Sequence, residues 1–206
     1  MTSGAKTRNP ECVRRLVAGA ALALAALPAL AFDLPELMAL LARQKSGEAH
    51  FTEERHVKGL DFPLQASGTL SFTAPDRFAR RTLKPKPEAM VVEGNTVTLS
   101  RGNRSRTVAL DATPEAAVAV ESVRATLTGN ASALQRYFKV TLAGDAERWT
   151  LELVPRELSQ AGPLRSVRIV GQRQQVRMVE THLADGDRSV MTIEPVAAAP
   201  AAPARQ

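Results

Sequence analysis

Short runs of alternating apolar and polar residues, separated by tight turns, are the feature that most constrains how this chain folds. In GTLSFTAPDRF, for example, Leu70 and Phe72 fall on one face of a strand, while Thr and Ser residues fall on the other. Pairs such as Gly94-Asn95 and Gly102-Asn103 favour hairpin turns between the runs. The pattern predicts about eleven strands in a mostly antiparallel sheet, at roughly residues 47–58, 64–73, 76–83, 88–93, 96–101, 104–110, 138–144, 147–154, 164–171, 174–183 and 187–194.

Three other segments carry the apolar period and the end signals of helices, at residues 33–47, 113–129 and 130–138. Asp33, followed three residues later by Glu36, has the arrangement of a capping box at the start of the first helix. Thr113 is expected to cap the second helix, and Gly129 is a typical helix stop. The order of elements is therefore one helix, six strands, two helices and five strands, which defines an α+β fold.

The predicted sheet has one large apolar face, and only three short helices are available to cover it. Either the sheet closes into a barrel, or the helices sit over its mouth as a lid above a cavity. The sequence pattern alone leaves both architectures open. A filled core is the ordinary interpretation of any single apolar residue on that face.

The two ends of the chain are expected to lie outside the folded domain. Four basic residues precede the apolar stretch 16–31, which ends in Ala29-Leu30-Ala31 and has the length of a signal peptide rather than of a membrane span. We expect cleavage after Ala31; an uncleaved N-terminal anchor helix is the alternative. Cys12, the only cysteine, precedes this stretch, so the exported chain would contain neither a thiol nor a disulfide. The segment 196–206 is rich in Ala and Pro and predicts a disordered tail, which leaves 32–195 as one domain.

The charge of the chain argues against a nucleic-acid-binding protein. The whole chain has 27 basic and 21 acidic residues, but beyond residue 31 these fall to 23 and 20, a net charge of +3. The remaining arginines are dispersed along the predicted strands and form no block in the sequence. We therefore expect no nucleic-acid partner.

No group of residues has the spacing of an enzyme site. His50 and His56 lie in one predicted strand, but six residues of strand span about 20 Å, which is too far for one metal ion. Glu53 and Glu54 are strand neighbours and point to opposite faces, so we interpret them as an exposed residue and an edge charge rather than as an acid/base pair. We predict no catalytic residue, no metal site and no cofactor.

The order of the elements, together with several local strings, resembles the LolA family of periplasmic carriers of outer-membrane lipoproteins. The resemblance covers about residues 33–195 and rests on FTEERHV, GTLSFTAPDRF, PEAMVVEGNTVTL, WTLELVPRE and LRSVRIVGQRQQVRMVETHLADGDRSVMTIEP in that order. It implies an incomplete, half-open antiparallel β-barrel with a lid of about three helices over a hydrophobic cavity.

Two departures from the family pattern concern the lid and the wall of this cavity. The family has an Arg, associated with holding the lid, just before the Pro of the strand–Pro segment, whereas this chain has Ala74. The residues in phase after Phe78 are Arg80 and Thr82, where the family commonly has aromatic and apolar residues. These departures are typical of a divergent subfamily, whose members are associated with export of other lipid-like products.

The resemblance implies a periplasmic, non-enzymatic and monomeric carrier that shuttles lipoproteins or a lipid-like product from the inner to the outer membrane. Its implied partners are acyl chains of the cargo, an inner-membrane exporter or ABC-type release complex, and an outer-membrane acceptor. Arg80 is expected to contact a head group. A module of the same fold that binds an envelope protein or peptide without lipid is the alternative. The residues expected to line the cavity are Leu70, Phe72, Phe78, Met90, Val92 and Leu99, and those of the lid are Val120, Val123 and Leu127.

Overall fold

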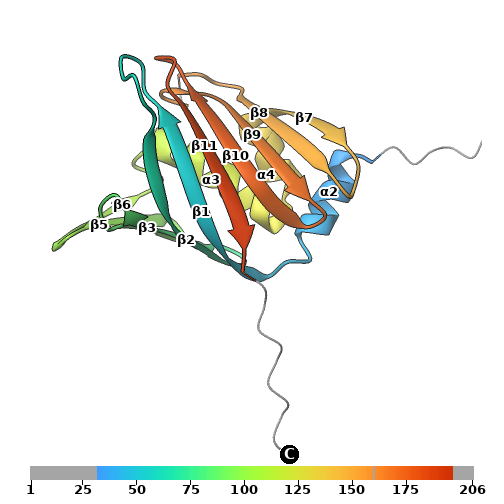
Figure 1. Cartoon of the computed structure of the whole chain (residues 1–206). Helices are drawn as coiled ribbons and strands as arrows, with labels where there is room; N and C mark the ends of the chain where they lie inside the picture. The colour runs from blue at the N-terminus through green and yellow to red at the C-terminus, as the bar shows by residue number, and fades with distance from the viewer. Residues whose placement is uncertain (1–31, 160, 197–206) are drawn as a thin grey trace, which may run out of the picture. The chain divides into compact units, whose positions relative to one another are not determined.

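The computed structural model describes residues 32–159 and 161–196, which form one sheet and three helices (Figure 1). The helices are α2 (Leu34–Leu41), α3 (Pro114–Thr128) and α4 (Ala131–Tyr137). The strands are β1 (Ser46–His56), β2 (Leu64–Thr73), β3 (Arg77–Lys84), β4 (Glu88–Glu93), β5 (Thr96–Arg101), β6 (Arg104–Ala109), β7 (Phe138–Gly144), β8 (Trp149–Pro155), β9 (Leu164–Gln172), β10 (Gln175–Leu183) and β11 (Arg188–Pro195). The predicted order of helices and strands is confirmed.

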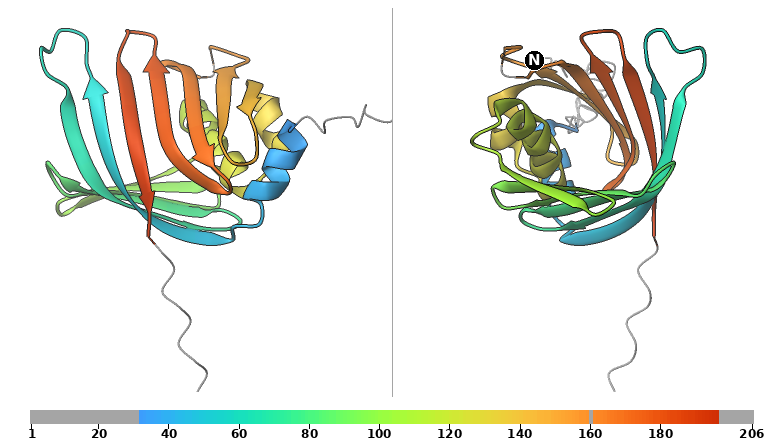
Figure 2. Two further views of the ribbon diagram at one scale, coloured as in Figure 1. Left: turned by 45° about the vertical axis from the view of Figure 1, so that its right-hand side comes forward. Right: turned by 90° about the vertical axis from the view of Figure 1, so that its left-hand side faces the viewer.

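All eleven strands belong to one antiparallel sheet in the order β6-β5-β4-β3-β2-β1-β11-β10-β9-β8-β7. The first and last strands, β1 and β11, pair in the middle, so the two halves of the chain meet there. The outer strands β6 and β7 do not pair with each other, and the sheet curls without closing (Figure 2). The three helices lie inside the curl, on its concave side (Figure 2). The predicted half-open barrel with three helices is thus confirmed, and a closed barrel is excluded.

Local sequence signals explain where the helices begin and end. The backbone N–H of Glu36 donates to Asp33 Oδ1 at 2.9 Å, and the Glu36 side chain accepts from the Asp33 N–H, which confirms the capping box. Gly129 ends α3 with φ of 68°, a conformation that favours glycine. Thr113 stands at the N-cap of α3 as predicted, but its side chain makes no capping hydrogen bond.

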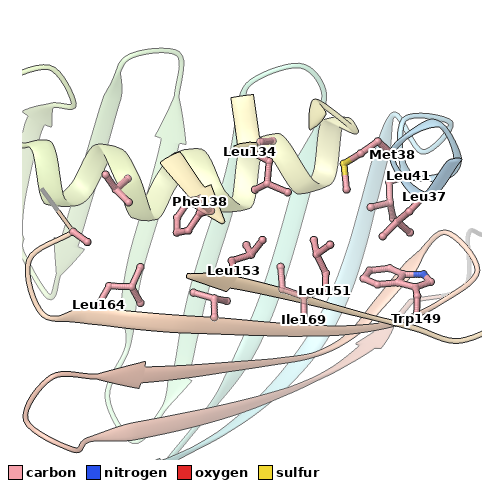
Figure 3. Packing of buried hydrophobic residues seen from close by; sticks show 14 residues of the cluster. Leu37, Met38, Leu41, Leu134, Phe138, Trp149, Leu151, Leu153, Leu164 and Ile169 are labelled. Carbon is pink, nitrogen blue, oxygen red and sulfur yellow. The ribbon is translucent and has the colours of Figure 1, made fainter. Parts of the chain in front are cut away.

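The larger hydrophobic core joins all three helices to strands β7–β9 (Figure 3). Trp149 is completely buried in it, and its indole N–H donates to the carbonyl oxygen of Arg173 at 2.8 Å. Gly171 lies directly opposite Trp149 in the register of β8 and β9. A Cβ on Gly171 would lie 2.0 Å from Cζ2 of Trp149, so only glycine leaves room for the indole. The buried members of this core are Leu37, Met38, Leu41, Val118, Ala125, Leu134, Phe138, Trp149, Leu151, Leu153, Ala161, Leu164, Val167 and Ile169.

A second, smaller core joins α3 to strands β3–β5 in the other half of the sheet. Its buried members include Phe78, Val92 and Val97 from the strands and Val120 from α3. Since Val118 of α3 belongs to the larger core, this one helix packs against both halves of the sheet.

Both cores lie within the unit Phe32–Gln206. Because the unit contains every described helix, strand and core residue, it has what it needs to fold on its own. The predicted signal peptide and its cleavage site lie outside the described residues. Of the predicted tail 196–206, only Val196 is described, and its backbone N–H donates to the carbonyl of Glu48 at 2.8 Å. Of the helices that are described, none has the length and apolar character required to cross a membrane.

Candidate functional site

The predicted cavity residues lie on one face of strands β2–β5, in two neighbouring rows. In the first row, which we call the covered row, Phe72 lies opposite Phe78, and Phe78 lies opposite Val92. Phe78 is 8% exposed and Val92 is 0% exposed. Val120, predicted for the lid, is buried in the same cluster. The cluster that includes Val120 of α3 thus seals Phe78 and Val92, whereas Phe72 at the end of the row is half-buried.

The second row, which we call the open row, consists of Leu70, Arg80, Met90 and Leu99 in consecutive strands. It shares the concave face with the covered row, since alternate residues of a strand point the same way. Leu70 and Met90 are half-buried, and Leu99 is 47% exposed. These apolar side chains therefore line the inside of the curl without being sealed by the helices.

The other two predicted lid residues belong to neither core cluster. Val123 is 40% exposed and Leu127 is half-buried. They thus differ from Val120, which is 7% exposed. One face of α3 is held by the cores, and other parts of the helix keep apolar surface accessible.

An arginine on α3 ties this helix to the sheet. Arg124 donates through Nη2 to the backbone carbonyl of Gly94, in the turn between β4 and β5. Its Nη1 pairs with Glu121 at 2.6 Å, one turn back along α3. At position 74, where the resemblance leads one to expect a lid-holding Arg, the half-buried Ala74 donates its backbone N–H to the carbonyl of Lys45. The hydrogen bond that joins α3 to the sheet is therefore donated by a residue of the helix, Arg124.

Arg80 forms a buried ion pair with Glu53 in the middle of the concave face. The Arg80 guanidinium contacts a Glu53 carboxylate oxygen through Nη2, and its carbon lies 4.7 Å from the centre of the Phe51 ring. The side chain of Glu53 is 5% exposed and that of Arg80 is 25% exposed. Arg55 approaches the same carboxylate at 3.6 Å with a side chain that is 52% exposed. Within the described part of the chain, Arg80 Nε is buried and has no hydrogen-bond partner.

This ion pair corrects one prediction from the sequence. Glu53 was expected to be exposed or to be an edge charge, but it is buried, and β1 is a central strand of the sheet. Glu54 is exposed on the opposite face, as alternation predicts. The register explains the contact: Gly68 of β2 lies opposite Phe51, so no side chain stands between β3 and the aromatic ring.

Strands β1, β10 and β11 lie between the two cores and are less completely covered. Phe51 and Ala49 are buried but belong to neither cluster. Every residue of β10 is half-buried, whereas a strand with one sealed face shows alternating burial. The middle of the concave face thus combines an apolar floor, a buried ion pair and incomplete cover.

A hollow of about 680 Å³ lies elsewhere, where the β2–β3 turn approaches the junction of α3 and α4. Asp76, Glu121 and Arg124 place charged groups in its lining. It includes none of the predicted cavity residues, so we do not identify it with the predicted hydrophobic cavity.

The histidines give no indication of a metal centre. His50 and His56 are exposed, and His182 lies 3.1 Å from a Glu180 oxygen. Among residues 32–159 and 161–196, no group of three or more His, Cys, Asp or Glu side chains gathers as metal ligands would.

The structure combines a half-open curled antiparallel sheet with helices on its concave side. The family model described as "Outer membrane lipoprotein carrier protein LolA-like" matches residues 23–206, and the chain belongs to this family. No curated protein sequence matches the chain.

Solved structures of similar fold come from several bacteria. A LolA superfamily protein, NE2245 from Nitrosomonas europaea, has 9% identity and a TM-score of 0.42, over 81% of this chain and 93% of that chain. A putative outer membrane lipoprotein-sorting protein domain from Vibrio parahaemolyticus has 9% identity and a TM-score of 0.41, over 82% of this chain and 93% of that chain. A Pseudomonas aeruginosa MucA/MucB complex has 15% identity and a TM-score of 0.45, over 82% of this chain and 59% of that chain. With TM-scores below 0.5, these likenesses carry no functional argument.

Proposed function

We propose that this protein is a non-enzymatic, extracytoplasmic carrier that covers the acyl chains of a lipoprotein or of a lipid-like product. The observation that carries the proposal is the open row. Leu70, Met90 and Leu99 face the inside of the curl, and the described helices leave them partly accessible, with Leu99 47% exposed. Membership in a family described as LolA-like lipoprotein carriers supports the same function.

The physical need for such a carrier follows from the hydrophobic effect. Exposing an acyl chain of about 16 carbons to water costs about 12 kcal/mol, at roughly 0.8 kcal/mol per methylene. A carrier has to cover most of this surface and still release it at the far membrane. Apolar side chains that are only half-covered, under a helix that can be released, meet both needs. In a closely packed core, the contacts between side chains would have to be broken for each transfer.

Three elements would act together in this proposal. The open row would contact the chain first, and the covered row with Val120, Val123 and Leu127 would become available as α3 swings away. Release of the Arg124 tie to Gly94 would accompany that movement, because the tie joins α3 to the β4–β5 turn.

Arg80 would contact the polar group of the cargo. Two arginines, Arg80 and Arg55, surround one buried carboxylate, Glu53, so the cluster carries an excess positive charge. The guanidinium of Arg80, whose side chain is 25% exposed, would donate to a carboxylate, phosphate or ester oxygen. We further propose that the protein is exported to the periplasm, receives cargo from an inner-membrane exporter or ABC-type release complex, and delivers it to an outer-membrane acceptor.

Native mass spectrometry of the protein purified from the envelope of cells that export it tests the proposal. We expect adducts whose mass includes an acyl chain. Leu99→Asp should abolish these adducts, whereas Val154→Asp should keep them. Val154 is a matched control because it is 39% exposed and stands between inward-facing Leu153 and Pro155, on the outer face of β8. Absence of every acyl-bearing species, even from the native host, would contradict the carrier and leave the peptide-binding module as the better account.

A further inference from the structure

The positive charge of the domain gathers at one edge of the sheet. Residues 77–109, which form strands β3–β6, contain eight Lys and Arg residues but only two Glu residues. The remaining positions of 32–196 contain 14 basic and 18 acidic residues. In sequence the arginines look dispersed, but the topology places these four strands side by side at the β6 edge. We call strands β3–β6 the basic arm.

Four of the exposed basic residues of the basic arm lie at the hairpin tips of one end of the sheet. Lys84 and Lys86 are exposed in the β3–β4 turn, and Arg104 is exposed at the start of β6. Arg101 lies opposite Glu88 in the register, and the two side chains pair at 2.8 Å, with Arg101 76% exposed. One carboxylate thus balances only one of these four basic side chains, and the tips keep a positive excess.

Large apolar side chains are exposed at the same end of the sheet. Leu83 in the β3–β4 hairpin is 60% exposed, and Phe62 and Leu60 in the β1–β2 loop are 82% and 52% exposed. In an antiparallel sheet the β1–β2, β3–β4 and β5–β6 turns all point to one end. Figure 2 shows the β1–β2 and β5–β6 hairpins projecting on the side away from α2. These exposed aromatic and aliphatic side chains, which share this end of the sheet with basic residues, belong to neither hydrophobic core.

We infer that these hairpin tips dock the protein on an anionic phospholipid membrane. Phe62 and Leu83 enter the interface between head groups and acyl chains, where aromatic and aliphatic side chains are stable. Lys84 and Lys86 lie above them and attract the lipid phosphates. The rest of the domain is net acidic and is repelled by the same surface, so the charge asymmetry orients the arm towards the membrane.

A membrane fits these observations better than an acidic protein partner does. The exposed apolar side chains come from two neighbouring hairpins, and a fluid interface accommodates such anchors without a matching shape. This inference does not rest on the proposed carrier function, since a protein that carries no lipid would still bind vesicles through these tips.

Flotation with vesicles measures the interaction directly. The unit Phe32–Gln206 is mixed with vesicles of phosphatidylethanolamine and phosphatidylglycerol, or with vesicles of phosphatidylcholine alone. We expect binding to the anionic vesicles that weakens as salt is added, and little binding to the neutral ones. The double variant Lys84→Gln/Lys86→Gln should bind about thirtyfold more weakly, which corresponds to about 1 kcal/mol for each basic residue lost. Phe62→Ser should weaken binding about tenfold or more, because it removes the most exposed anchor.

Lys139→Gln/Arg148→Gln is the matched control, since it removes the same charge from exposed positions at the β7 side of the sheet. This control should bind like the wild type. Equal weakening by the control would show that net charge alone drives binding, and absence of binding to anionic vesicles at low salt would refute the inference. Binding to polyglutamate but not to vesicles, lost in Lys84→Gln/Lys86→Gln, would instead assign the arm to an acidic protein. Acyl adducts in the envelope preparation are scored separately, so failure of docking and failure of the carrier function are distinguishable.

Discussion

Replacing Arg80 by Met removes the cation of the central ion pair and leaves a buried carboxylate behind. Glu53 is 5% exposed and keeps only Arg55 nearby, at 3.6 Å. The methionine keeps an apolar side chain beside Phe51. It loses the cation–π attraction of the guanidinium, whose carbon lies 4.7 Å from the centre of the Phe51 ring. We therefore expect Arg80→Met to destabilise the folded state.

The magnitude follows from the geometry. At an effective dielectric constant of about 20, two unit charges about 4 Å apart attract by roughly 4 kcal/mol. Breaking a buried pair by removing one partner costs about 3–5 kcal/mol. Arg80 is 25% exposed, and Arg55 partly compensates the remaining carboxylate, so we expect the lower end of this range. A loss of about 3 kcal/mol would lower Tm by about 6–12 °C for a domain of this size.

Urea unfolding followed by tryptophan fluorescence measures this loss. Trp149 is the only tryptophan in the chain and is completely buried, so its emission reports the folded core. The double variant Glu53→Met/Arg80→Met removes the orphaned carboxylate and should recover stability to within about 1 kcal/mol of the wild type. A loss of less than about 1 kcal/mol in Arg80→Met would show that the ion pair is not effectively buried. If the loss in the double variant equals the sum of the losses in Arg80→Met and Glu53→Met alone, the two side chains are not coupled and the reasoning is wrong.

Three further predictions concern the core, the tie and the two rows. Gly171→Ala should destabilise the domain by about 2 kcal/mol or more in the same urea assay, because the added Cβ would meet Trp149 at 2.0 Å; a loss under about 0.5 kcal/mol would show that the indole moves aside freely. Arg124→Met should raise hydrogen exchange of the α3 amides roughly tenfold, since it removes a charged donor from the Gly94 carbonyl, and unchanged exchange would show that the tie does not restrain the helix. Val92→Ala should cost about 2–3 kcal/mol, because Val92 is 0% exposed, whereas Leu99→Ala should cost under about 1 kcal/mol, because Leu99 is 47% exposed; equal losses would contradict the division into a covered and an open row.

Local signals were sufficient to predict the order of helices and strands. The capping box at Asp33 and the positive φ of Gly129 are properties of a few neighbouring residues, and the structure confirms both. Tight turns force consecutive strands to pair, so most of the sheet order followed from the same signals. The pairing of β1 with β11 joins the ends of the domain, and the family resemblance rather than the alternation pattern indicated the open barrel.

The central ion pair needed information that no local pattern contains. Glu53 and Arg80 are 27 residues apart and come together because of the register across β1, β2 and β3. The Arg124 tie likewise depends on how α3 lies over the β4–β5 turn. The basic excess of residues 77–109 can be counted in the sequence, but the topology is needed to place it at one edge of the sheet. Each of these features is a long-range contact or a surface, which a strand-by-strand analysis does not show.

The central claim is that acyl chains bind against the open row inside the curl. A fatty acid with a photoactivatable group at its tail tests it most directly, when it is crosslinked to the unit Phe32–Gln206 and the labelled residues are found by peptide mass spectrometry. We predict labels in β2, β4 and β5, around Leu70, Met90 and Leu99, that an excess of unlabelled fatty acid removes. Labels confined to the hairpin tips or to the outer face around Val154 would contradict the account.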